Sequence, residues 1–310
     1  MKKDRRVSLR KIISNLNLLE TSRILKKYYK YIPGKPGRPP ISPTGIFLSF
    51  ILMLIRMESY RDYHAFLEKH QFWRRTLGFK QTPDIGNFTH FLQRIGTDTL
   101  EQLFQSVVQQ LLNEGFLNLH IVAQDGSILK GNLDDKEAGW GWDHIKEEFV
   151  YGYKIHVIVD VKTELPIVFN VTLANVHDSK EFQRLYSKTK SYKTRFPTRF
   201  FTADKAFDTH NIRMTLRRDD VQPIIKVSKT RIKPQYPKWF LEKYKKRVAV
   251  ERFFSRLKEY LDLKKLCIYN KNNVLIYTYF VCIGILLIGY INHLLGYSPR
   301  SIKTFLRLYT

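Results

Sequence analysis

Three carboxylates in this sequence stand where two strands and a helix would bring them together. Asp125 follows the apolar run LHIVAQ at 119–124, and Asp204 follows RFFTA at 199–203. Glu251 lies in YKKRVAVERFFSRLK at 244–258, a strongly basic context for a single acid. Phosphodiester chemistry uses two divalent cations about 3.5–4 Å apart, bound by a few carboxylates. These acids therefore predict a site for two Mg²⁺ ions, for which Mn²⁺ could substitute.

Each of these acids also has a simpler interpretation when it is considered alone. Asp125 and Asp204 could be turn or cap residues, because Asp-Gly and similar pairs are common in turns. Glu251 could pair with Arg247, four residues earlier on a helix. The prediction of a site therefore depends on the three acids taken together.

Two further acids compete for a place in the site. Asp160 lies in the run VYGYKIHVIVDV at 150–161, but it precedes a turn at the far end of its expected strand. Asp178 follows His177 in NVHDS, where we expect it to be the N-cap of the next helix. We therefore rank both below the three acids.

The spacing around Glu251 separates these interpretations. The residues follow the pattern Tyr244-x2-Arg247-x3-Glu251-x6-Lys258, which on a helix puts Arg247, Glu251 and Lys258 on nearly the same face. The pattern resembles the Y-x2-R-x3-E-x6-K signature of insertion-sequence DDE transposases of the IS-four and IS-five-like type. The resemblance covers residues 118–292 well and the preceding helical region more loosely.

The resemblance implies a DNA transposase that binds terminal inverted repeats, cleaves DNA at the ends of the element and joins the freed 3′-hydroxyl to target DNA. It implies that Asp125, Asp204 and Glu251 are the catalytic, metal-binding triad. It also implies that the other signature residues contact DNA phosphates, which suits the donors of Arg and Lys. The expected DNA-binding set is Tyr244, Arg247, Lys258, Arg252, Arg256 and Trp239.

One departure from the family concerns a β-rich insertion that some members carry between the second Asp and the Glu. Here only 46 residues separate Asp204 from Glu251. A route through a DNA hairpin, in which that insertion holds a flipped base, is therefore in doubt. Trp239 could stack on a base, or it could be a packing residue. Trp140 and Trp142, in the expected loop GWGWD, have the same two interpretations.

The elements around these residues predict a ribonuclease-H-like α/β fold. After residue 118, strands are expected at 119–124, 150–161, 166–174, 199–206 and 221–227, with helices at 178–190, 208–218 and from about 241. This order predicts a mixed β-sheet flanked by helices.

An all-helical region is expected before the sheet, at 41–57, 59–69, 84–95 and 98–114, with Gly96 and Gly115 as stops. The run Ile85–Ile95 could be a DNA recognition helix or a packing helix. We therefore expect a basic tail and Pro/Gly linker at 1–40, a helical DNA-binding region at 41–117 and a catalytic domain at 118–310.

The charge of the chain indicates a polyanionic partner. Lys and Arg number 53 against 28 Asp and Glu, a formal net charge of +25. Residues 1–40 carry 12 basic and 2 acidic side chains, and residues 226–265 carry 14 and 4. Such segments would bind double-stranded DNA favourably, because binding releases counterions from the phosphates. A homodimer is expected, because synapsis joins two DNA ends.

One apolar segment requires a choice between a membrane span and a buried helix. Residues 274–291, VLIYTYFVCIGILLIGYI, are uncharged for 18 residues. They include Tyr277, Tyr279 and Tyr290, so we expect a buried helix, which the resemblance places against the sheet. Cys267 and Cys282 show no CxxC spacing, and the charged residues MKKDRRVSLRKI are not followed by the apolar region of a secretory signal, so a cytoplasmic, nucleoid-associated protein is expected.

Three rival functions stay open at this stage. A ribonuclease-H-like nuclease or resolvase would cleave without strand transfer. A transposase-derived DNA-binding protein would lack catalysis, against which the intact triad argues. A membrane-associated basic protein would depend on residues 274–291.

Overall fold

The computed structural model describes residues 13–14, 16–28, 41–56, 58–143, 147–195, 197–228, 234–260, 266 and 268–307. Two compact units share the chain: Met1–Gln110 with Ile276–Thr310, and Leu111–Leu275. The expected linker at 33–40 and Cys267 lie outside the described residues. We expected residues 118–310 to form one domain, whereas the structure groups residues 276–310 with the N-terminal helices.

The first unit is helical, as predicted. Its longest N-terminal helix, α6, merges the two helices expected at 84–95 and 98–114, and Gly96 breaks it with φ 69° and ψ 160°. Gly115, just after α6, has φ +71°, a conformation that glycine adopts at little cost. The described helices of this unit are α2 (Leu18–Tyr28), α3 (Pro43–Arg56), α4 (Tyr60–Lys69), α5 (Gln71–Thr76), α6 (Ile85–Asn113), α11 (Lys271–Leu294) and α12 (Ile302–Arg307).

The expected basic tail contains a folded element. Helix α2 buries Ile24 and Leu25, while its lysines Lys26 and Lys27 are exposed. Its contacts are with α3, although the linker segment separates the two in sequence. The prediction of a tail was therefore wrong for residues 18–28, which form a helix. Their many charged residues made the amphipathic pattern hard to recognise in the sequence.

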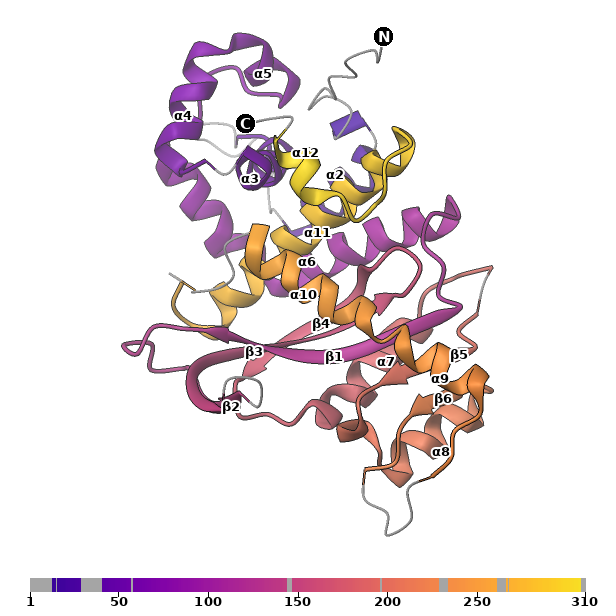
Figure 1. The fold of residues 1–310 in the computed structure, drawn as a ribbon. Helices are drawn as coiled ribbons and strands as arrows, with labels where there is room; N and C mark the ends of the chain where they lie inside the picture. The colour runs from indigo at the N-terminus through magenta and orange to yellow at the C-terminus, as the bar shows by residue number, and fades with distance from the viewer. Residues whose placement is uncertain are drawn as a thin grey trace. The chain divides into compact units, whose positions relative to one another are not determined.

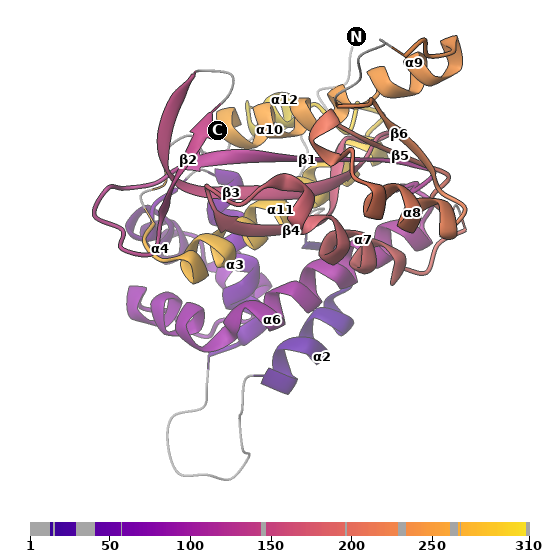
Figure 2. The same ribbon diagram turned by 90° about the horizontal axis from the view of Figure 1, so that it is seen from below.

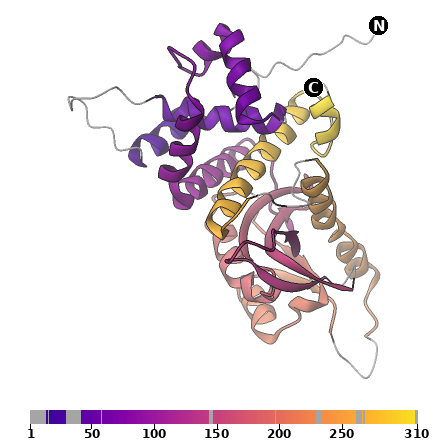
Figure 3. The same ribbon diagram turned by 90° about the vertical axis from the view of Figure 1, so that its left-hand side faces the viewer.

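The C-terminal apolar segment packs among N-terminal helices (Figure 3). The ring of Phe280 in α11 lies 4.8 Å from Phe50 and 5.7 Å from Phe47, both in α3. A Cβ on Gly284 would come within 2.6 Å of Leu54, so glycine allows this close approach. The expected burial is confirmed, and Phe47, Phe50 and Leu54 of the first unit supply these contacts.

Among the described residues, α11 alone is long and apolar enough to cross a membrane. The most apolar part of α11 is 89% buried within the structure, as in the core helix of a soluble protein. Length and composition are therefore weak evidence for a membrane span here.

The run Ile85–Ile95 uses its apolar face for packing. Phe88, Phe91 and Ile95 are buried, and the rings of Phe88 and Phe91 lie within 6 Å of Phe50. The interpretation as a packing helix therefore holds for the apolar face of this run. The opposite face, with Gln93 and Arg94, is exposed.

The second unit has a six-stranded mixed sheet (Figure 1). Strands β1, β3 and β4 are antiparallel neighbours, whereas β5 lies parallel to β1 and β6 parallel to β5. This is the predicted ribonuclease-H-like arrangement. The strands are β1 (Ile121–Lys130), β2 (Gly139–Asp143), β3 (Glu148–Asp160), β4 (Leu165–Leu173), β5 (Phe200–Ala203) and β6 (Gln222–Ile225).

Helices cover both faces of this sheet, α10 on one side and α7 and α8 on the other (Figure 2). Helix α10 contacts β1 and β3. On the opposite face, Phe182 and Tyr186 of α7 contact Phe201 of β5 edge to face. The helical elements of this unit are η1 (Asp178–Glu181), α7 (Phe182–Lys190), η2 (Lys205–Phe207), α8 (His210–Arg218), α9 (Lys238–Lys245) and α10 (Val248–Tyr260).

Two strands differ from the prediction. The segment GWGWD, expected as a loop, is β2 and pairs with β3. Its glycines hid the strand, because glycine is depleted in strands. Gly141 is needed there, since a Cβ would lie 2.5 Å from the carbonyl oxygen of Ala174. Strand β1 also continues past Asp125 to Lys130, because β3 pairs with it throughout.

Candidate active site

The parallel pairing of β1 and β5 places Asp125 beside Asp204. The last pair in this register is Gln124 with Ala203. Asp125 is the next residue of β1, and Asp204 directly follows the end of β5. Asp204 keeps an extended backbone, with φ −69° and ψ 166°. Side chains at the same register position of neighbouring strands point to the same face. Both carboxylates therefore point to the face that α10 covers.

Glu251 lies in the first turn of α10. The long helix expected from Leu241 is two helices, α9 and α10, with a turn at Lys246 and Arg247. In this turn the amide of Arg247 donates to the carbonyl of Tyr244, and that of Val250 to the carbonyl of Arg247, both at 3.0 Å. These bonds span three residues instead of four, so the chain tightens just before Glu251.

Arg247 joins two of the three predicted catalytic acids. Its Nη1 lies 3.2 Å from Oδ2 of Asp125, and its Nη2 lies 2.6 Å from Oε1 of Glu251. The pairing with Glu251 was one of the two interpretations left open by the sequence. The contact with Asp125, which is 122 residues away, was not foreseen. Arg247 therefore neutralises carboxylates in this structure, whereas a contact with DNA phosphate was expected.

Tyr244 contacts the third acid. Its hydroxyl donates to Oδ1 of Asp204 at 3.4 Å, a long hydrogen bond, and its ring stacks on Phe240 with centroids 6.3 Å apart. The amine of Lys226 lies 4.5 Å from the centre of the same ring. The signature thus links Tyr244 to Asp204 and Arg247 to Asp125 and Glu251, so it ties α9 and α10 to the ends of two strands.

Burial has a large effect on Asp125. The pKa of this carboxyl is raised to about 7, mainly by burial; the charges of Asp178 and Asp204 add to the rise, while the Gly126 amide and Arg247 oppose it. A carboxyl with such a pKa changes charge near neutral pH. Perturbed groups of this kind cluster at functional sites.

The three acids offer the ligand type that Mg²⁺ prefers, because hard cations take carboxylate oxygens. Among the described residues, no three His, Cys, Asp or Glu side chains lie close enough together to bind one metal ion. In this structure Arg247 contacts both Asp125 and Glu251 and supplies a positive charge between them. The donor chemistry of the three acids fits Mg²⁺.

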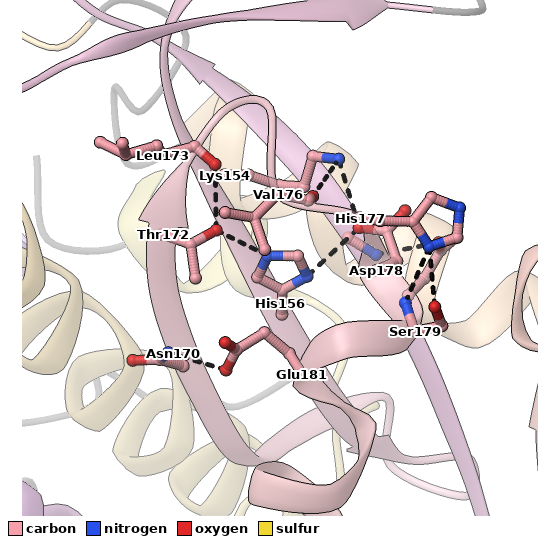
Figure 4. A network of polar contacts seen from close by, with 12 residues as sticks. Lys154, His156, Asn170, Thr172, Leu173, Val176, His177, Asp178, Ser179 and Glu181 are labelled. Carbon is pink, nitrogen blue, oxygen red and sulfur yellow. Dashed lines mark hydrogen bonds and ion pairs between the residues drawn. The ribbon is translucent and has the colours of Figure 1, made fainter. Parts of the chain in front are cut away.

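Around Asp178, which lies against Gly126, is a polar network that the sequence did not predict (Figure 4). Asp178 was expected to cap a helix, but His177 caps η1 by accepting from the Ser179 amide. The Asp178 Oδ1 lies 3.2 Å from Nδ1 of His156 and 3.4 Å from Nζ of Lys154. Although burial raises the pKa of Asp178, the hydrogen bond from His156 and the charge of Lys154 lower it overall.

This network fixes the strand at the residue after Asp125. A Cβ on Gly126 would lie 2.1 Å from Oδ1 of Asp178, so only glycine fits. His156 is fully buried, and its Nε2 lies 2.8 Å from the Thr172 hydroxyl. That hydroxyl donates to the Leu173 carbonyl at 3.1 Å, so it accepts from His156. Asp178 is thus held against β1 by the side chains of Lys154 and His156 on β3.

The predicted DNA-binding residues of α10 have different surroundings. Both Arg252 and Arg256 bind Glu164, at 3.2 Å and 2.7 Å. The side chain of Arg252 is 59% exposed and that of Arg256 only 12%. The position of Arg256 is that of an internal ion pair, whereas Arg252 faces solvent.

Of the other candidates, Lys258 is half-buried on α10, and Trp239 is exposed on α9 with its ring edge-on to Phe240. Asp160 is buried and accepts from the Thr163 hydroxyl and amide, so it caps the turn between β3 and β4. Its position at the far end of β3, opposite Val122, agrees with its lower rank.

Comparison with known proteins gives a consistent result. Residues 119–287, more than half of the chain, match the family described as Transposase DDE domain, and residues 2–94 match Transposase domain (DUF772). No curated protein matches the chain.

The matching solved structures include two DNA complexes of transposases. One is the piggyBac transposase synaptic complex with hairpin DNA, solved by cryo-EM, with a TM-score of 0.50, 12% identity, and coverage of 96% of this chain and 76% of that chain. The other is the Mos1 transposase paired-end complex with the left transposon end, with a TM-score of 0.23, 10% identity, and coverage of 78% and 84%. At this identity the first likeness speaks for the fold alone.

Proposed function

Because this chain belongs to the transposase DDE domain family, we propose that it is the transposase of a prokaryotic insertion sequence of the IS-four and IS-five-like type. It binds the terminal inverted repeats, cleaves DNA at the ends of the element and joins the 3′-hydroxyl to target DNA. The observation that carries the proposal is that the signature residues contact all three acids: Arg247 binds Asp125 and Glu251, and Tyr244 binds Asp204.

The proposed roles follow from these positions. Asp125, Asp204 and Glu251 would bind two Mg²⁺ ions, which Mn²⁺ could replace. Such ions activate the attacking oxygen and stabilise the leaving oxygen of a phosphodiester. Arg247 neutralises two of these carboxylates in the structure, and on release its guanidinium can grip a phosphate. Tyr244 orients Asp204 through its hydroxyl.

DNA would be bound by the basic surface around α9 and α10. The segment 226–265 has 14 basic and 4 acidic residues, and it includes Arg252, Lys258 and the exposed Trp239. The helical region at 41–117 would contact the repeats, and two copies of the chain would bring two ends together. A nucleoid-associated, cytoplasmic location follows from this partner.

The experiment uses the full chain with DNA that carries the repeats flanking its gene. We expect Mg²⁺-dependent cleavage and joining by the wild-type chain and neither by Asp204→Asn, a near-isosteric change. Asp219→Asn is the matched control, because Asp219 pairs with Lys190 at the surface of the same unit. An Asp204→Asn chain that cleaved and joined as well as the wild type would refute the proposal.

The same assay separates the rival functions. Cleavage without joining would indicate a nuclease or resolvase. Repeat binding without any metal-dependent reaction would indicate a non-catalytic DNA-binding protein.

A further inference from the structure

The hairpin of β2 and β3 exposes a cluster of aromatic rings. Trp140 is 55% exposed, Trp142 41% and Phe149 67%. The register pairs Trp140 with Tyr151 and Trp142 with Phe149, so these rings lie on one face of the hairpin. We call the exposed surface of Trp140, Trp142 and Phe149 the aromatic hairpin.

The rings are ordered by one another. Trp140 lies 5.2 Å from Tyr151 and Trp142 lies 4.9 Å from Phe149, both measured between ring centroids. Between the two tryptophans, Gly141 points inward and packs against Ala174. The hairpin thus turns its smallest residue to the interior and its largest to solvent. Such a pre-ordered apolar surface is typical of an interaction site.

The charge around the aromatic hairpin opposes that of the whole chain. Residues 131–148 include six acidic and two basic side chains, a net charge of −4 in a chain of +25. Asp134, Glu137, Glu147 and Glu148 are exposed. Acidic groups close to the rings would repel a phosphate backbone, because charges interact within a Debye length of about 8 Å. DNA is therefore a poor partner for this surface.

We propose that the aromatic hairpin docks on a basic surface of a second copy of this chain. A second copy offers the opposite charge, because the chain as a whole has a net charge of +25. In a two-fold dimer each copy would give its hairpin to the other, so two equivalent contacts form. The proposal deepens the dimer expected for the proposed function and rests on it, but it involves none of the catalytic acids.

The test is the oligomeric state of the full chain without DNA, measured by sedimentation over a range of protein concentrations. We expect a dimer whose Kd rises at least tenfold in the variant Trp142→Ser/Phe149→Ser. The charge reversal Glu147→Lys/Glu148→Lys should weaken it by a similar factor. Raising the salt from about 0.05 M to about 0.3 M should weaken the wild-type dimer, because it screens opposite charges.

Met214→Ser is the matched control, since Met214 is an equally exposed apolar residue, 51%, on α8. Its dimer should keep a Kd within twofold of the wild type. All the substituted side chains are exposed or partly exposed, and urea unfolding checks that each variant is folded.

Three results would overturn the proposal: a wild-type chain that stays monomeric, hairpin variants that dimerise normally, or hairpin variants that lose DNA binding while the dimer persists. The last result would make DNA the occupant. Failure of the proposed function is distinguishable, because a chain that dimerises through the hairpin but does not cleave DNA would contradict only that function.

Discussion

Two arginines one turn apart on α10 should respond very differently to the same substitution. Arg252 and Arg256 both bind Glu164, whose side chain is 2% exposed. Arg256 donates to Oε2 at 2.7 Å and to the carbonyl oxygen of Glu164 at 3.1 Å, and it is itself 12% exposed. Arg252 makes one contact at 3.2 Å and is 59% exposed. Arg256 is therefore the main partner of a buried carboxylate.

The magnitude follows from what each change leaves behind. Arg256→Met leaves the Glu164 carboxylate buried with one exposed partner, and breaking a buried ion pair costs about 3–5 kcal/mol. Because Arg252 remains, we expect the lower end, about 3 kcal/mol. Arg252→Met removes a mostly exposed partner and should cost about 1 kcal/mol or less.

The assay is urea unfolding of the full chain, followed by tryptophan fluorescence and circular dichroism because the chain has two units. With an m-value of about 1–3 kcal/mol/M, Arg256→Met should lower the midpoint by about 1 M or more. DNA binding should show the reverse order: Arg252→Met should reduce the salt slope by about one phosphate contact, and Arg256→Met should not. Equal losses of stability in the two variants would refute the reasoning.

Three further predictions concern Asp125 and its neighbours. The pKa of Asp125 is about 7 in the folded chain and 3.8 in the unfolded chain, so its neutral form adds stability that is present below pH 3.8 and is lost as the pH rises through 7. Without added divalent cation, Asp125→Asn should therefore be more stable than the wild type at pH 8, by at most about 4 kcal/mol. A variant less stable than the wild type at that pH would contradict this. Cleavage needs the ionised carboxyl, so Asp178→Asn, which removes a charge that raises the pKa of Asp125, should move the midpoint of the pH–rate profile to lower pH. An unmoved midpoint argues against the coupling. Gly126→Ala places a Cβ against Asp178, so it should lower the free energy of unfolding by about 1–3 kcal/mol through overpacking and abolish cleavage. The control Gly86→Ala, whose Cβ meets nothing within 4 Å, should leave cleavage unchanged.

Local patterns in the sequence determined most of the elements. The strands β3 to β6 and the helices α3, α4 and α8 lie where periodicity and turn residues predicted them. The family signature and the two aspartates were also visible, because spacing along one helix and strand ends are local features. The approximate location of the site therefore followed from the sequence, whereas its catalytic role stays a prediction.

What only the tertiary structure decided is the pairing of side chains that are distant in sequence. Arg247 reaches Asp125 across 122 residues, and Arg256 reaches Glu164 across 92. From the sequence we expected both arginines to bind DNA, because a positive charge by itself does not show which anion a guanidinium binds. The same holds for α11, whose uniform hydrophobicity predicts burial but not the partner. These choices depend on long-range packing, in which the whole fold selects one neighbour among many of similar chemistry.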